Sequence, residues 1–123
     1  MVRRRQLLQH STALSLSLGP WMARSEPAWP SRPLRWVVPF APGGASDTVG
    51  RIIQPAMADL LKQQVVVDNR GGAGNNIGTD IALKAPADGY TLLLVNPANA
   101  INATLYSKLP FDFLRDYAPV AGI

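Results

Sequence analysis

The sequence contains no cysteine and a single histidine, His10, among its 123 residues. Without cysteine, no disulfide framework can hold the fold and no thiol is available for catalysis. Because His10 lies so near the N-terminus, the rest of the chain has no histidine to supply to a zinc site or to a catalytic dyad or triad. Carboxylates, hydroxyls, amides and backbone groups are left as the available chemistry.

An excess of positive charge is also missing from most of the chain. The formal net charge is +4 and the isoelectric point is near 10. Arg3, Arg4, Arg5 and Arg24 account for the whole excess, because the other eight basic residues are balanced by eight acidic ones. The rest of the chain, which is neutral by count, lacks the excess of basic residues by which proteins bind nucleic acid or anionic lipid. We therefore expect no nucleic-acid partner.

The N-terminal residues have the pattern of an export signal. The arginines are followed by an apolar stretch over residues 12–22 and then by small residues, the order found in secretory signal peptides. The apolar stretch is too short to span a bilayer, so we expect no membrane insertion once the signal is removed. Residues 4–8, Arg-Arg-Gln-Leu-Leu, also fit the twin-arginine pattern, and the choice between the two export routes stays open. Residues 1–28 are assigned to the signal and its lead-in, and residues 29–123 to the mature chain.

Beyond residue 33 the patterns of strands and helices alternate. Short apolar or β-branched runs predict strands, and apolar residues spaced three and four apart predict amphipathic helices. Pro55 lies inside the first helical pattern and is expected to bend or split it, and Ser46 or Asp47 is expected to cap it. Such alternation indicates an α/β fold with a parallel sheet covered on both faces. The expected strands are residues 34–40, 64–67, 91–95 and the beginning of one at 117–122, and the expected helices are residues 46–62, 75–84 and 98–106.

Three loops are expected at the carboxyl ends of these strands, over residues 39–46, 69–75 and 96–99. Each is rich in glycine, proline or asparagine and poor in charge. Ligands of parallel α/β sheets bind at this edge, glycine lets a ligand approach the backbone closely, and the N-terminus of the following helix favours an anion. We interpret the loops as a site for a carboxylate or a phosphate. Tight turns are the alternative reason for the glycines.

The common nucleotide and nucleophile motifs do not fit. Residues 72–78 read G-x-G-x-x-x-G, one residue too long for the dinucleotide fingerprint, and residues 44–48 lack the last glycine of a nucleophile elbow. Asp47 and Asp68 are conceivable as an acid/base pair, but a helix N-terminus and a strand end account for them equally. Arg70 is either a carboxylate clamp or an ion-pair partner of Asp68. An α/β enzyme and a ligand-free interaction module remain as alternatives to a small-molecule binding protein.

Five ordered blocks of residues resemble one family. They lie within residues 33–47, with Pro42-Gly43-Gly44 and Asp47, within residues 65–78 and 84–93, and at Ala100-Ile101-Asn102 and Leu105-Tyr106. Together they resemble the Bug family, the extracytoplasmic substrate-binding proteins of tripartite tricarboxylate transporters, over about residues 31–123. The resemblance implies a two-lobed Venus-flytrap protein of periplasmic type II architecture. Such a protein binds a small carboxylate, uses no cofactor, has no enzymatic activity and delivers its ligand to a membrane permease.

The resemblance also implies that loop backbone amides and ordered water hold the ligand. Phe40 would wall the cleft, the glycine amides and the Ser46 hydroxyl would donate to a carboxylate, and Asp47 would receive an amino group or cap the helix. Gly71 and Asn75 depart from the family pattern, which often has proline and glycine there. For the asparagines of the third loop, a turn-forming role is the alternative. The implied ligand-binding residues are Phe40, Pro42, Gly43, Gly44, Ser46 and Asp47 in the first loop, Gly72, Ala73, Gly74 and Asn76 in the second, and Asn96 and Asn99 in the third.

In the family, the second lobe and the strands that complete the first sheet would lie beyond residue 123. The resemblance therefore implies that residues 29–123 are the N-terminal part of lobe 1 of such a protein. The strands of a parallel sheet need neighbours and covered faces. We accordingly expect the 123-residue chain to be marginally stable and to bind a carboxylate no more tightly than roughly millimolar, since only one wall of the cleft would be present.

Overall fold

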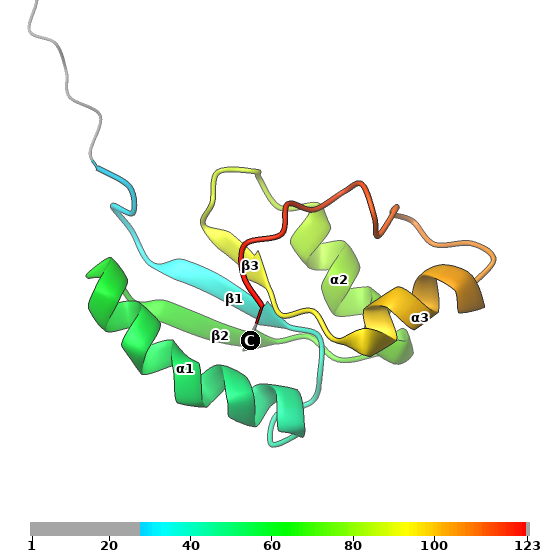
Figure 1. Ribbon diagram of the computed structural model, residues 1–123, viewed down its shortest axis with the longest axis horizontal. Helices are drawn as coiled ribbons and strands as arrows, with labels where there is room; N and C mark the ends of the chain where they lie inside the picture. The colour runs from blue at the N-terminus through cyan, green and yellow to red at the C-terminus, as the bar shows by residue number, and fades with distance from the viewer. Residues whose placement is uncertain (1–27, 123) are drawn as a thin grey trace, which may run out of the picture.

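A computed structural model describes residues 28–122 of the chain (Figure 1). Strands alternate with helices through these residues, which confirms the predicted α/β class. The predicted export signal lies outside the described residues except for Ala28. The elements are β1 (Leu34–Val38), α1 (Ala45–Leu61), β2 (Val65–Asn69), the 3₁₀ turn η1 (Ala73–Asn75), α2 (Asn76–Leu83), β3 (Thr91–Leu93) and α3 (Pro97–Leu105).

The three strands form one parallel sheet in the order β2-β1-β3. Backbone hydrogen bonds to β1 continue past the ends of both neighbouring strands, β2 and β3. The N–H of Arg70 donates to the carbonyl oxygen of Val38 at 2.8 Å, and the N–H of Leu94 donates to that of Val37 at 2.9 Å. The carboxyl ends of all three strands therefore meet at one edge, as the sequence predicted for the three loops.

The core lies between the sheet and α1. Side chains of a strand point alternately to its two faces, and Leu34, Trp36 and Val38 are buried on the face that α1 covers. Burial of each large apolar side chain stabilises the fold by about 2 kcal/mol. Val37 is fully buried on the other face, where α2 lies (Figure 1). The partly buried side chains of α1 that pack into the core are Ile53, Met57, Ala58 and Leu61.

Helix α1 continues through Pro55 as one element, so the prediction of a split there is wrong. Proline removes one intrahelical hydrogen bond, which normally weakens the helix at that point. Here Pro55 is exposed, and Ile53 and Met57 pack into the core on either side of it. In addition, Nε2 of Gln54 donates to the carbonyl oxygen of Val65 at 2.9 Å. Tertiary contacts therefore hold the helix together across the proline.

The strand predicted at residues 117–122 is absent, and this segment has no regular secondary structure. Val120 is 84% exposed. A short apolar run becomes a strand only where another strand supplies its hydrogen bonds, and among residues 28–122 none pairs with this segment. Coverage of the sheet is also partial, because Val66 on β2 is half exposed. None of the helices in residues 28–122 has the length and apolar character needed to cross a membrane.

Candidate functional site

The carboxyl ends of β1 and β3 are neighbours, and the chain leaves them toward opposite faces of the sheet. Strand β1 is followed by α1 on one face. Strand β3 is followed by α3, which packs against α2 and η1 on the other side (Figure 1). A crevice forms where the connections from neighbouring strands diverge, and ligands of open α/β sheets bind there. The fold therefore puts the candidate site between the ends of β1 and β3.

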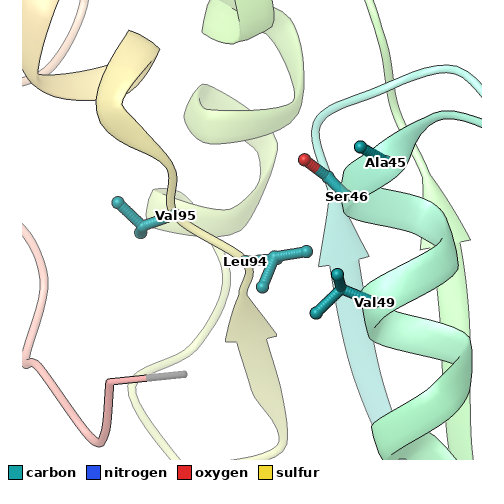
Figure 2. A pocket seen from close by; sticks show the side chains of 5 residues that line it. All are labelled: Ala45, Ser46, Val49, Leu94 and Val95. Carbon is teal, nitrogen blue, oxygen red and sulfur yellow. The ribbon is translucent and has the colours of Figure 1, made fainter.

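An open hollow of about 170 Å³ lies at this point. It is lined by Ala45, Ser46 and Val49 at the beginning of α1 and by Leu94 and Val95 after β3. Figure 2 shows the Ser46 side chain projecting from α1 into the gap in front of residues 94–95. Complete small-molecule sites usually enclose about 300–1,000 Å³. The hollow is therefore large enough for only part of a ligand, and Ser46 is the one polar side chain that lines it.

Helix α1 begins without a side-chain cap. Its N-cap residue is Gly44, which has extended backbone and no side chain to accept a hydrogen bond. The N–H groups of Ala45, Ser46 and Asp47 have no hydrogen-bond acceptor among residues 28–122. The prediction that Ser46 or Asp47 caps the helix is wrong, because the helix already begins at Ala45. Three unpaired donors at the positive end of a 17-residue helix are the usual elements of an anion site.

Asp47 is buried and fully engaged with its own chain. Its Oδ2 accepts from the N–H of Gly43 at 2.8 Å, both oxygens accept from Nε of Arg51 at 3.0 Å, and Oδ1 accepts from Nδ2 of Asn69 at 2.9 Å. Hydrogen bonds from Arg51, Gly43 and Asn69, in that order, lower the pKa of Asp47 to about 2, against the opposing effect of burial. Asp47 thus ties the first loop to the end of β2. The N–H of Gly43, which was expected to face the ligand, donates to Asp47 instead.

The other residues predicted in the first loop differ in exposure. Phe40 is half-buried and packs against the core on the α1 side. Pro42, Gly43 and Gly44 are exposed. Gly43 has a φ of +81°, a conformation that glycine adopts at little cost. Phe40 therefore supports the base of the loop, and contact of these four residues with a ligand stays a prediction.

The second loop is a run of left-handed backbone. Gly72, Ala73, Gly74 and Asn75 have φ values of 128°, 46°, 61° and 81°. The conformation is strained at Ala73 and Asn75, since residues with a Cβ disfavour it by roughly 1–2 kcal/mol each. The N–H groups of Ala73 and Gly74 find no acceptor in the described part of the chain. Consecutive free N–H groups in such backbone make a concave anion-binding surface, so these two predicted residues keep their donors available.

The first and second loops are in close backbone contact. A Cβ on Gly71 would lie 3.2 Å from the nitrogen of Ala41. A Cβ on Gly78, in α2, would lie 2.8 Å from Cα of Pro39 and would also collide with the carbonyl oxygen of Arg70. At Gly78 only glycine permits this approach, whereas a Cβ at Gly71 would require its backbone neighbours to shift by a few tenths of an ångström. The donors at the start of α1 and those of the second loop are thereby held on one rigid support.

The asparagines of the third loop cap α3. Oδ1 of Asn96 accepts from the N–H of Ala98 at 2.9 Å, and Oδ1 of Asn99 accepts from the N–H of Asn96 at 3.0 Å, which completes a capping box. Nδ2 of Asn99 also donates to Oγ1 of Thr79 on α2 at 2.7 Å. Both residues therefore have a structural role, as helix caps rather than as turn residues, and a ligand contact stays untested.

Asn102 was not among the predicted site residues. It is 5% exposed, and its Nδ2 donates to the carbonyl oxygen of Gly74 and, at 3.0 Å, to Oδ1 of Asn76. The signal in the sequence was the spacing of Asn96, Asn99 and Asn102, because residues three apart share one face of a helix. A buried face that carries asparagines indicates a hydrogen-bonded polar network.

The charged residues near the end of β2 pair with one another. Asp68 accepts from Nε of Arg35 at 2.7 Å and from Nε of Arg70 at 2.8 Å. Burial is the largest influence on the Asp68 carboxyl and acts to raise its pKa, but the hydrogen bonds and charges of Arg35 and Arg70 together lower it below the usual range. Arg70 is thus the ion-pair partner of Asp68. Residues 28–122 contain no group of three His, Cys, Asp or Glu side chains that could hold a metal ion.

Known proteins resemble the chain in both sequence and structure. BugT of Bordetella pertussis is 43% identical over 101 residues, which make up 80% of this chain and 31% of BugT. A protein encoded in the tcbD-tcbE intergenic region of Pseudomonas sp. is 43% identical over 119 residues, or 97% of this chain and 35% of that protein. The chain therefore spans about a third of the length of these curated relatives.

Solved structures of known proteins also resemble the chain. MatC from Rhodopseudomonas palustris with bound malate matches with a TM-score of 0.70 and 36% identity over 74% of this chain and 31% of MatC. A second R. palustris protein, with adipate, matches with a TM-score of 0.63 and 37% identity over 70% of this chain and 29% of that protein. A family model described as the tripartite tricarboxylate transporter family receptor matches residues 49–123. The chain belongs to this receptor family, whose members include periplasmic binding proteins of the Bug type.

Proposed function

We propose that this chain forms one wall of the carboxylate-binding cleft of an exported solute-binding protein, which passes its ligand to a membrane permease. The observation that carries the proposal is the uncapped start of α1 beside the hollow at the ends of β1 and β3. Its three unpaired N–H groups and the Ser46 hydroxyl are donors without a competing acidic side chain, since both oxygens of Asp47 are engaged elsewhere.

The ligand that suits these donors is a small dicarboxylate. One carboxylate would accept from the N–H groups of Ala45, Ser46 and Asp47, and the left-handed second loop offers the N–H groups of Ala73 and Gly74 as further donors. Two of the similar solved structures hold malate and adipate, which supports this class. Periplasmic location and delivery to a permease are proposed from membership of the receptor family.

An enzymatic function is not favoured by any observation at the site. General acid/base chemistry needs a carboxyl whose pKa lies near the working pH. The pKa values of Asp47 and Asp68 are both shifted the other way, by hydrogen bonds that keep the carboxylates ionised. We therefore propose binding without turnover.

Thermal denaturation of the chain with malate and with adipate tests the proposal, with the corresponding neutral diamides as matched controls. A ligand at 100 times its dissociation constant adds about 2.7 kcal/mol of stability, so saturating dicarboxylate is expected to raise the melting temperature and the diamides are not. Sodium chloride at equal ionic strength controls for general salt effects. Equal shifts with diamides and dicarboxylates would contradict a carboxylate site.

A further inference from the structure

We propose that Asn102 is a positioning residue that holds the left-handed second loop in the conformation that presents its N–H groups to the ligand. This inference deepens the proposed function and rests on it. Asn102 is on α3, 28 residues beyond Gly74 in sequence, yet its Nδ2 donates to the carbonyl oxygen of Gly74 and to Oδ1 of Asn76. It thus contacts both the middle of the loop and the first residue of α2.

The second loop needs such support because its backbone is unfavourable on its own. Four successive residues, 72–75, have positive φ, and two of them are not glycine. Strained backbone of this kind persists only where surrounding contacts determine it. Among the described residues, the loop's own backbone hydrogen bonds are few: the N–H of Asn75 donates to the carbonyl oxygen of Gly72 at 3.0 Å, that of Ile77 donates to the same oxygen at 3.5 Å, and that of Asn76 donates to the carbonyl oxygen of Ala73.

The orientation of the loop's peptide groups follows from the Asn102 contact. When the carbonyl oxygen of Gly74 accepts a hydrogen bond from α3, the peptide plane that joins Gly74 to Asn75 is fixed. The N–H of this peptide, that of Asn75, donates to the carbonyl oxygen of Gly72, which belongs to the peptide that carries the N–H of Ala73. The carbonyl oxygen of Ala73, on the peptide that carries the N–H of Gly74, accepts from the N–H of Asn76, whose side chain Asn102 also contacts. The N–H groups of Ala73 and Gly74 themselves have no acceptor among residues 28–122. Asn102 therefore controls the direction of donors that it does not itself supply.

The position of α3 is also fixed by Asn99, which lies one turn before Asn102 in the same helix. Asn99 donates to Thr79, whose hydroxyl donates to the carbonyl oxygen of Asn75 at 2.9 Å. Asn99 and Asn102 therefore hold the strained loop and the first turn of α2 from one face of α3. The side chains of this network are buried, those of Asn76, Thr79, Asn99 and Asn102, although Gly74 itself is exposed. Removing one partner of a buried hydrogen bond costs more stability than removing one partner of an exposed hydrogen bond, because water cannot reach the polar group that remains.

Replacing Asn102 by aspartate tests the proposal, because aspartate keeps the shape and removes both donors. Thr104→Ala is the matched control, since Thr104 is exposed on the same helix and its hydroxyl bonds only to Ile101 within α3. In ligand-free protein we expect Asn102→Asp to shift the ¹H–¹⁵N resonances of Ala73, Gly74 and Asn75 and to speed hydrogen exchange at Asn75 by about tenfold. In malate titrations we expect an affinity about tenfold weaker, and Thr104→Ala should change neither quantity.

The two readouts separate failure of this inference from failure of the proposed function. If wild-type chain shows no malate response, the carboxylate function is wrong, and the ligand-free spectra still decide the role of Asn102. Unchanged loop resonances and unchanged Asn75 exchange in a folded Asn102→Asp chain would overturn the inference. If the variant does not fold, hydrogen exchange at the side-chain amide of Asn102 in the wild-type chain tests the inference instead. Its protons should exchange with water more slowly than those of Asn96, and equal rates would overturn the inference.

Discussion

Helices α1 and α3 begin at the same edge of the sheet, but only the N-terminus of α3 is capped by side-chain hydrogen bonds. Helix α3 has an asparagine at its N-cap, a capping box with Asn99 and a proline in its first turn. Helix α1 is almost twice as long and has Gly44 at its N-cap, with no side-chain hydrogen bond that caps it. Local propensity alone would favour a cap on both helices.

The difference supports our proposal that the N-terminus of α1 receives a ligand, whereas that of α3 serves the fold. Capping satisfies the first-turn donors within the chain, so the start of α3 is stable and closed to an incoming anion. Leaving out the cap costs stability and keeps donors free beside the hollow that Ser46 lines. A sequence that forgoes a cap at one helix and builds a complete one at its neighbour is consistent with selection for binding at the first.

The largest expected effect comes from moving the backbone contact that supports the start of α1 and the second loop. Gly78→Ala would set a Cβ 2.8 Å from Cα of Pro39. Because backbone rather than a flexible side chain must move, we expect a loss of about 3 kcal/mol in the free energy of unfolding, measured by urea denaturation. Gly50→Ala is the control, as its Cβ would lie at an ordinary 3.7 Å from Cγ2 of Val38. An equal effect of both substitutions would show that the loop contact is not tight.

Acid should weaken the first loop before it weakens the α3 cap. The pKa of Asp47 falls from 3.8 to about 2 on folding, so its stabilising contribution is complete above about pH 4 and is lost as pH falls toward 2. The asparagine cap does not titrate. We expect the stability of the wild type to fall over this pH range and that of Asp47→Asn to fall less, measured by denaturant midpoints at each pH. Parallel pH profiles would contradict the role assigned to Asp47.

Removal of the α3 cap gives a smaller effect that separates stability from binding. Asn96→Ala deletes the side chain that accepts from Ala98, and loss of an N-cap costs about 1 kcal/mol. Thermal melts should show this loss, while the response to malate should keep its wild-type size. A large loss of malate binding in Asn96→Ala would instead assign Asn96 to the ligand.

The smallest stability change is expected from adding a cap to α1. Gly44→Asp introduces an acceptor at the N-cap, where the extended backbone and a nearest neighbour at 3.4 Å allow a side chain. The chain should gain a few tenths of a kcal/mol or slightly more, because an N-cap aspartate also complements the helix dipole. Carboxylate affinity should nevertheless fall, since the new carboxylate occupies the same donors. Gly44→Ser, without the charge, is the matched control for the size of the side chain.

Much of the fold was predictable because its determinants are local. Apolar periodicity over residues 46–62 and β-branched runs at β1 and β2 report burial directly, and each became the expected element. A split at Pro55 and a strand at residues 117–122 were predicted wrongly, because the packing on both sides of the proline and the lack of a pairing strand depend on tertiary structure. The meeting of the three loops at one edge of the sheet was predictable from the alternation of strands and helices. The hydrogen bonds of the loops were not, because Asp47 accepts from the Gly43 amide and Asn102 bonds to Gly74 across 28 residues.

A residue-resolved titration of the chain with malate tests the central claim most directly. In ¹H–¹⁵N spectra we expect the amides of Ala45, Ser46 and Asp47 to shift with increasing malate, while the first-turn amides of α3, at Ala98 and Asn99, stay in place because the cap already engages or shields them. Malate-dependent shifts confined to α3, or equal shifts at the two helix starts, would contradict the account in which only the uncapped helix receives the carboxylate.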